Sequence, residues 1–233
     1  MRNYIILNGV NSNTITGLLI SKLPPITKPK IRTQIEEIDG RDGDIITKLG
    51  YSSYDKTIEI GLYGNYDVNQ VISYFNSEGT IVFSNELDKY YNYQILDQID
   101  YEKLIRFKTA KVKLHMQPFK FPTQEDVINI SGETEVNNVG NIYARPVINI
   151  SGSGNIEINL NGIQIFSLDL GENEVDIVID TNQMEAYNPN SKALMNRQVT
   201  GDYSLFKIEV GSNTIELSGS VTSASISNYT RWI

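Results

Sequence analysis

Charged side chains gather in one stretch of the sequence, IDGRDGDI, which runs from Ile38 to Ile45. Carboxylates at this spacing could hold a divalent cation or act as a general acid–base pair, and they also occur in tight turns. The stretch is therefore the first place to look for chemistry. Its charged members are Asp39, Arg41, Asp42 and Asp44.

The sequence favours a turn over a metal or catalytic site. Counted from Asp39, the third position of an EF-hand loop would be Arg41, which is not an oxygen ligand. Counted from Asp42, the fifth position would be Ile46. The two glycines of the stretch can adopt positive φ, and aspartates can satisfy exposed amides of a turn. A turn does not need Arg41, whose forked guanidinium suits pairing with a carboxylate.

Enzymatic motifs are absent from the rest of the chain. The sequence has no cysteine and one histidine, His115, which shares a polar strand face with Lys113 and is interpreted as a solvated strand residue. There is no nucleophile elbow and no phosphate-binding loop, and GSGNIE ends in Glu157 where a dinucleotide-binding loop needs glycine. We therefore predict no catalytic, cofactor-binding or metal-ligating residues, no cofactor, and no enzyme activity.

Composition and charge predict two domains with different surroundings. Of the 233 residues, 40% are apolar and 21% are charged, and no apolar run is long enough to span a membrane or to act as a signal peptide. Residues 1–117 carry no net charge and include ten of the 14 tyrosines, whereas residues 118–233 carry the whole net charge of −8. A neutral, tyrosine-rich surface suits protein interfaces, and an acidic one repels nucleic acid.

Period-two alternation predicts strands through most of the chain. TIEIGLYG from Thr57 and GTIVFSN from Gly79 are typical strands, and the alternation in LIRFK predicts another, with a β-bulge near Thr109. One helix is expected at about residues 67–78, capped by Asp67. The two prolines of MQPFKFPTQED mark a domain junction. Beyond it, NIEINLNGIQIFSL predicts a hairpin in an antiparallel β-sandwich.

These segments, in order, resemble the distal tail protein family of siphophages. The resemblance covers nearly the whole chain, although each segment alone is loosely matched. The first half contributes YIILNGVNSNTITGLLI, IDGRDGDI, LGYSSYDKTIEI and the helix before GTIVFSN. The second half contributes NVGNIYARPVINISGSGNIEINLNG, IDTNQMEAYN and GDYSLFKIEVGSNTIELSG.

The resemblance implies an all-β protein with one short helix. Residues 1–120 would form a ring-forming, barrel-like (split-barrel) domain that carries the helix, and residues 121–233 a galectin-like β-sandwich. The family implies a homo-hexameric ring in the tail tip or baseplate of the virion, made in the host cytoplasm. Its partners would be the major tail tube protein on one side, and the tail-associated lysin or baseplate and receptor-binding proteins on the other.

In such a ring DNA passes through the lumen. The resemblance implies no sequence-specific nucleic-acid partner and no membrane partner. The resemblance supplies no catalytic residues. From charge and position we interpret Asp39, Arg41, Asp42 and Asp44 as assembly contacts in a turn. Two alternatives remain: a galectin-like carbohydrate-binding adhesin, for which the lone Trp232 offers little support, and a tail-tip enzyme that cuts cell wall.

Overall fold

The computed structural model describes residues 2–75 and 77–233 and divides into two compact units. Unit 1 extends to Thr123 and also includes Ile233, and unit 2 is Gln124–Trp232. Both units are built mainly from β-strands, so the all-β prediction is confirmed. No helix among the described residues is long and apolar enough to cross a lipid bilayer.

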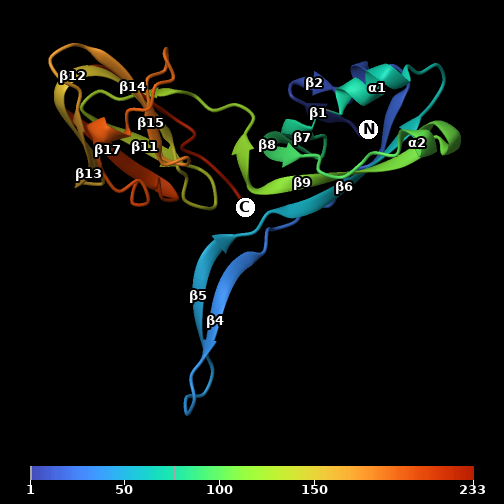
Figure 1. Cartoon of the computed structure of the whole chain (residues 1–233), viewed down its shortest axis with the longest axis horizontal. Helices are drawn as coiled ribbons and strands as arrows, with labels where there is room; N and C mark the ends of the chain where they lie inside the picture. Colours follow the sequence, from blue (N-terminus) through green and yellow to red (C-terminus); the bar gives the residue numbers. More distant parts are fainter. Residues whose placement is uncertain (1, 76) are drawn as a thin grey trace. The chain divides into compact units, whose positions relative to one another are not determined.

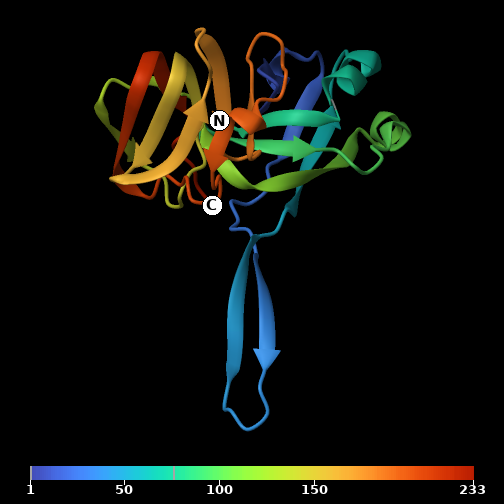
Figure 2. The same ribbon diagram turned by 60° about the vertical axis from the view of Figure 1, so that its left-hand side comes forward.

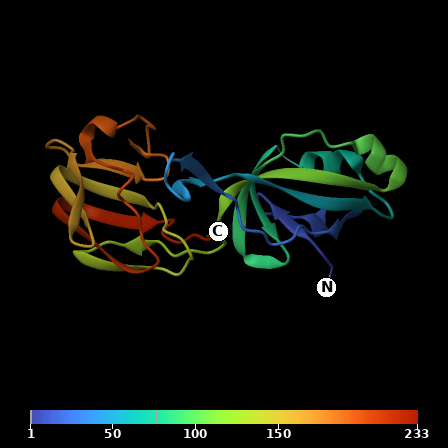
Figure 3. The same ribbon diagram turned by 90° about the horizontal axis from the view of Figure 1, so that it is seen from below.

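Unit 1 contains a seven-stranded antiparallel sheet that curls into a half-barrel (Figures 1 and 3). Its strands follow the spatial order β2-β1-β7-β8-β9-β6-β3. A separate two-stranded sheet, formed by β4 and β5, branches from the same unit. The strands of unit 1 are β1 (Ile5–Leu7), β2 (Val10–Asn11), β3 (Leu18–Lys22), β4 (Ile31–Glu37), β5 (Asp44–Tyr51), β6 (Tyr54–Leu62), β7 (Glu78–Phe83), β8 (Glu86–Gln94) and β9 (Thr109–Pro122).

The core of unit 1 follows the alternation of its central strands. Ile58 and Ile60 of β6 are fully buried, and Val112 and Leu114 of the neighbouring β9 are buried beside them. The predicted strands at TIEIGLYG and GTIVFSN correspond to β6 and β7. β9 continues through the prolines of the predicted junction as far as Pro122.

Helix α1 (Val68–Tyr74) begins where it was expected but is shorter. The Asp67 side chain accepts hydrogen bonds from the amides of Asn69 and Gln70, which confirms the predicted cap. The predicted end at residue 78 is wrong, because Glu78 already pairs with Gln94 of β8. Sheet pairing thus overrides helix propensity at this point. Asn76, which the predicted span included, lies outside the described residues.

A second helix, α2 (Tyr101–Phe107), replaces the strand that was predicted at LIRFK. Asp100 caps it by accepting a hydrogen bond from the amide of Lys103, and Lys108 ends it in the left-handed region. Leu104 is its buried residue. The change of phase near Thr109 is therefore a helix-to-strand junction rather than a β-bulge, and the prediction of a single helix was wrong.

Unit 2 is a single eight-stranded sheet folded into two layers. β12 and β17 are its long central strands, and shorter strands pair with them on either side. A short 3₁₀-helix (Asn196–Gln198) precedes β16. The strands are β10 (Ile128–Asn129), β11 (Glu133–Asn138), β12 (Val147–Leu160), β13 (Ile163–Asp169), β14 (Val175–Asp180), β15 (Glu185–Tyr187), β16 (Val199–Gly201) and β17 (Gly211–Ser227).

The two layers arise because β12 and β17 bend together. Their register shifts on either side of Gly152 and Ser153, and the first half of β12 pairs with β14 while the second half pairs with β13. Gly219 of β17 lies at this bend with φ +106, and a Cβ there would lie 2.2 Å from a backbone oxygen. Buried residues from both halves, such as Ile150 and Ile158, form one core between the layers.

Candidate functional site

The hairpin formed by β4 and β5 is the most unusual feature of unit 1. Its two strands pair with each other from Ile31–Tyr51 at the base to Glu37–Asp44 at the tip, and they join no other sheet. Figure 2 shows it extending away from the curled sheet of unit 1. We refer to residues 31–51 as the arm and to residues 38–43 as its tip.

The tip is the tight turn that the sequence predicts. The amide of Arg41 donates a hydrogen bond of 3.1 Å to the carbonyl oxygen of Ile38. Gly40 and Gly43 both have φ of +78, so the prediction that these glycines adopt positive φ is confirmed. This hydrogen bond and the two glycines account for the turn.

The structure brings the four candidate residues together at the end of the arm. Asp39, Arg41 and Asp42 are exposed in the turn, and Asp44 is the first residue of β5. Within the described part of the chain, no ion pair involves the Arg41 side chain. Residues 36–44 hold five carboxylates against one guanidinium, with Glu37 directly opposite Asp44. Such like-charge pairing opposes hairpin formation and favours a cationic partner.

Adding calcium or a chelator is expected to shift the melting temperature by less than about 1 °C. A ligand raises the melting temperature only if it binds the folded state. Across the described residues, no group of three or more acidic or histidine side chains is close enough to hold a metal ion. Differential scanning fluorimetry measures this shift when one sample contains millimolar calcium and the other contains EDTA. A rise of several degrees would instead assign the tip carboxylates as ligands.

Apolar side chains along the arm have no core to pack against. Ile35 and Ile46 face each other across the hairpin, and 57% and 60% of their surfaces are exposed. Leu49 is 53% exposed at a shift of register near the base. These residues have no role that can be assigned from the sequence, because their pattern is typical of any half-buried strand. A two-stranded hairpin with an unburied apolar surface is marginally stable by itself, so a surface that covered these side chains would stabilise the arm.

The base of the arm is joined to unit 1 by a small number of specific contacts. The ring of Tyr51 packs edge-on against Phe119 of β9, with 5.6 Å between the ring centroids. The amide of Ser52 donates a hydrogen bond of 2.8 Å to the carbonyl oxygen of Lys30. These contacts close the hairpin at its root and leave its strands free along their length.

His115 lies on β9 within a cluster of charged side chains. Its Nδ1 lies 2.9 Å from a carboxylate oxygen of Asp55, and this is the only hydrogen bond of its side chain in the described structure. Lys113 forms ion pairs with Asp55 and with Asp97, at 3.0 and 3.1 Å. Hydrogen bonds from His115 and Lys113 hold the pKa of Asp55 below its ordinary value. The group is a paired surface cluster, which agrees with its interpretation as part of a solvated strand face.

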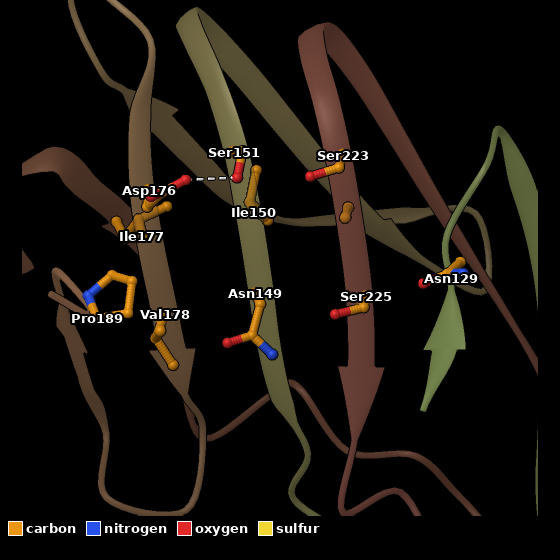
Figure 4. A pocket seen from close by; sticks show the side chains of 11 residues that line it. Asn129, Asn149, Ile150, Ser151, Asp176, Ile177, Val178, Pro189, Ser223 and Ser225 are labelled. Atoms are coloured by element: carbon orange, nitrogen blue, oxygen red, sulfur yellow. Dashed lines mark hydrogen bonds between the residues drawn. The ribbon is translucent and has the colours of Figure 1, made fainter. Parts of the chain in front are cut away.

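Unit 2 carries a shallow polar pocket on the outer face of one layer (Figure 4). Asp176 of β14 lies within it, where its carboxylate accepts hydrogen bonds from Ser151 and from Asn190. The pocket has a volume of about 160 Å³, and none of the residues lining it is aromatic. It gives little support to the carbohydrate-binding alternative, because the aromatic platform expected of a sugar site is absent from its lining.

No family model and no curated protein matches this chain. Solved structures that share its fold include two from phages. One is the Dit protein (gp 19.1) of phage SPP1, described as a paradigm of the hub adsorption apparatus in phages that infect Gram-positive bacteria. It is 14% identical with a TM-score of 0.70, and the alignment covers 100% of each chain. The other comes from the phage P2 baseplate in its activated conformation with Ca. It is 10% identical with a TM-score of 0.51, over 97% of each chain.

Proposed function

We propose that this protein is a distal tail protein of the compact form, the structural hub of a bacteriophage tail tip or baseplate. The proposal is supported by the fold shared with the SPP1 Dit protein over the full length of both chains. Both structural neighbours are components of phage adsorption machinery, and neither is described as an enzyme. The protein would act in the virion, after synthesis in the host cytoplasm.

In this proposal six copies form a ring between the tail tube protein and the baseplate or receptor-binding proteins, and DNA passes through its lumen. The observation that carries the ring is the arm. Its apolar residues, including Ile35 and Ile46, are exposed in a single chain and would be buried against a neighbouring copy. The tip residues Asp39, Arg41 and Asp42 would then make the polar contacts at the end of that interface.

The charge distribution gives independent support for this arrangement. Residues 1–117 have no net charge to oppose close packing of neighbouring copies, whereas residues 118–233 carry the whole net charge of −8. An acidic unit at the periphery of a ring would keep the assembly soluble and would not attract nucleic acid. DNA would then pass through the ring without being bound by sequence-specific contacts.

Light scattering coupled to size exclusion tests the ring directly. Six copies of the 26.3 kDa chain give a mass of about 158 kDa. Low salt and high protein concentration should favour this species, because the tip contacts are charged. A protein that remains monomeric at high concentration, and that binds glycans as an intact chain, would favour the galectin-like adhesin instead.

A further inference from the structure

A buried lysine lies on the core face of β6, at a position where the strand pattern calls for an apolar residue. Lys56 has the same parity as Ile58 and Ile60, which are fully buried, and only 4% of its own surface is exposed. Its ammonium lies 5.6, 5.9 and 5.4 Å from the ring centroids of Tyr54, Phe83 and Tyr91. Cation–π contacts of this kind offset only part of the cost of burying a charge.

This ammonium holds the segment that leads to the arm. Lys56 Nζ donates a hydrogen bond of 2.6 Å to the carbonyl oxygen of Pro25. Pro25 belongs to residues 23–30, the crossing segment, which connects β3 with β4 and contains three prolines. Prolines have no amide hydrogen to donate, so three of the eight residues of this segment cannot donate to a strand ladder.

The hydrogen bond from Lys56 is isolated. Among the residues that the structure describes, no other hydrogen bond reaches residues 23–29. A pocket of about 420 Å³ is lined by Pro24, Pro25 and Thr27 on one side and by Asp55 and Thr57 of β6 on the other. The segment is therefore not packed against β6 along its whole length. Leu23 packs against the core and Pro24 and Pro29 are buried, and Lys56 adds the hydrogen bond that holds the Pro25 carbonyl.

The neighbouring buried lysine has a different role. Lys120 of β9 donates a hydrogen bond of 2.9 Å to Glu86 of β8, and Tyr91 also bonds to this carboxylate. Lys120 thus neutralises a buried acid, whereas Lys56 bonds to a backbone carbonyl of the crossing segment. The two lysines have nearly the same burial, so Lys120 provides a matched control for Lys56.

We infer that Lys56 is a positioning residue, which fixes the direction of the arm by anchoring its root to the core of unit 1. A methionine would fill the same space without the cost of a buried charge, but it could not hold the Pro25 carbonyl. The effect on ring formation rests on the function proposed above, whereas the effect on the arm of a single copy does not.

The direction of the arm can be measured with two spin labels. The chain has no cysteine, so Lys48→Cys in the arm and Ser73→Cys on α1 give a unique labelled pair, and both positions are exposed. In monomeric protein, Lys56→Met should widen the distribution of label distances roughly twofold. The melting temperature should stay the same or rise, because a buried charge has been removed. Lys120→Met should lower the melting temperature and leave the width unchanged.

A pH series provides a second test, in which the arm is followed in protein that keeps Lys56. Burial lowers the pKa of Lys56 to about 8, with the charge of Lys120 adding to the effect and that of Glu86 opposing it. The nearby Tyr54 and Tyr91 have raised pKa values and stay neutral up to pH 9.5. Between pH 7 and 9.5 the native lysine loses its proton while the unfolded one keeps it, so stability relative to Lys56→Met rises.

The arm should become more mobile over the same range, because an uncharged amine is a weaker donor to the Pro25 carbonyl. Greater stability accompanied by a looser arm would not be produced by a lysine whose role was only structural. The inference would be overturned if Lys56→Met left the width of the label-distance distribution unchanged. It would also be overturned if Lys120→Met widened that distribution equally. If Lys56→Met widens the distribution but the ring forms as before, the positioning role stands and the proposed role of the arm in assembly fails.

Discussion

Replacing Ile35 and Ile46 together with threonine is expected to abolish ring formation and to leave the stability of the single chain almost unchanged. Both side chains are more than half exposed, so their removal costs the folded monomer about 0.5 kcal/mol or less. Threonine retains a β-branched side chain and therefore keeps the strand propensity of the arm. The expected change in free energy is therefore confined to the interface that buries these two side chains.

The size of the effect follows from the burial of two isoleucines in each contact. Burial of such a side chain from full exposure is worth about 1.5–3 kcal/mol, and a little more than half of each surface remains to be buried, so losing both weakens one contact by about 2–3 kcal/mol. That is roughly thirtyfold to a hundredfold in the dissociation constant of each interface. A closed ring needs every one of its contacts, so the loss is felt around the whole assembly.

The measurement is the mass distribution by light scattering, together with thermal unfolding of the same samples. Ile163→Thr is the matched control, because Ile163 is 65% exposed on β13 of unit 2, outside the arm. It should assemble like the parent. If the arm variant also forms rings of unchanged mass, the exposed isoleucines do not lie in the interface between copies.

The arm illustrates what period-two alternation can and cannot predict. The glycines of the tip correctly predict the turn, and the residues on both sides of it form strands β4 and β5. Alternation does not show whether the apolar face of a strand meets a core of the same chain. Ile35 of the arm and Ile58 of β6 occur in similar patterns, but one is exposed and the other fully buried. Only the three-dimensional sheet order separates them.

The other differences between prediction and structure have local physical causes. Helix α2 has only seven residues, too few for its period to be distinguished from an alternating strand, and its Asp100 cap was the available signal. The short end of α1 is set by pairing with β8, which is distant in sequence. The sequence shows Lys56 as a charged residue at a position of β6 where the alternation calls for an apolar one. Its acceptor, the Pro25 carbonyl, depends on the path of a proline-rich segment and cannot be predicted from that pattern.

Loss of the Arg41 side chain is expected to shift the protein from ring to monomer without affecting the folding of the chain. Arg41 is exposed at the tip of the arm, and its backbone amide closes the turn by a hydrogen bond to the Ile38 carbonyl oxygen. The turn itself therefore places no demand on the guanidinium. The surrounding tip is acidic, so a carboxylate that pairs with Arg41 is expected to belong to a neighbouring copy.

The cost of Arg41→Ala depends on whether that pair is shielded from water. Removing one partner of a buried pair costs about 2–5 kcal/mol, because the other charge is left unpaired. An exposed pair contributes less than about 1 kcal/mol. The side-chain contacts repeat at each interface of a ring, so even the lower value should reduce the fraction of assembled protein. Arg41→Lys should restore assembly only in part, since an ammonium cannot form the forked bond.

Sedimentation velocity across a salt titration measures this shift, with Arg197→Ala as the control for loss of an exposed arginine outside the arm. The control should assemble like the parent at every salt concentration. The difference in assembled fraction between Arg41→Ala and the parent should diminish as salt rises, because salt screens the charge pair that the parent forms. If Arg41→Ala assembles like the parent throughout, Arg41 serves only the turn, and any contact made by the tip belongs to its carboxylates. Asp39→Asn and Asp42→Asn should then weaken the ring where Arg41→Ala does not, as expected for an acidic tip that meets a cationic surface.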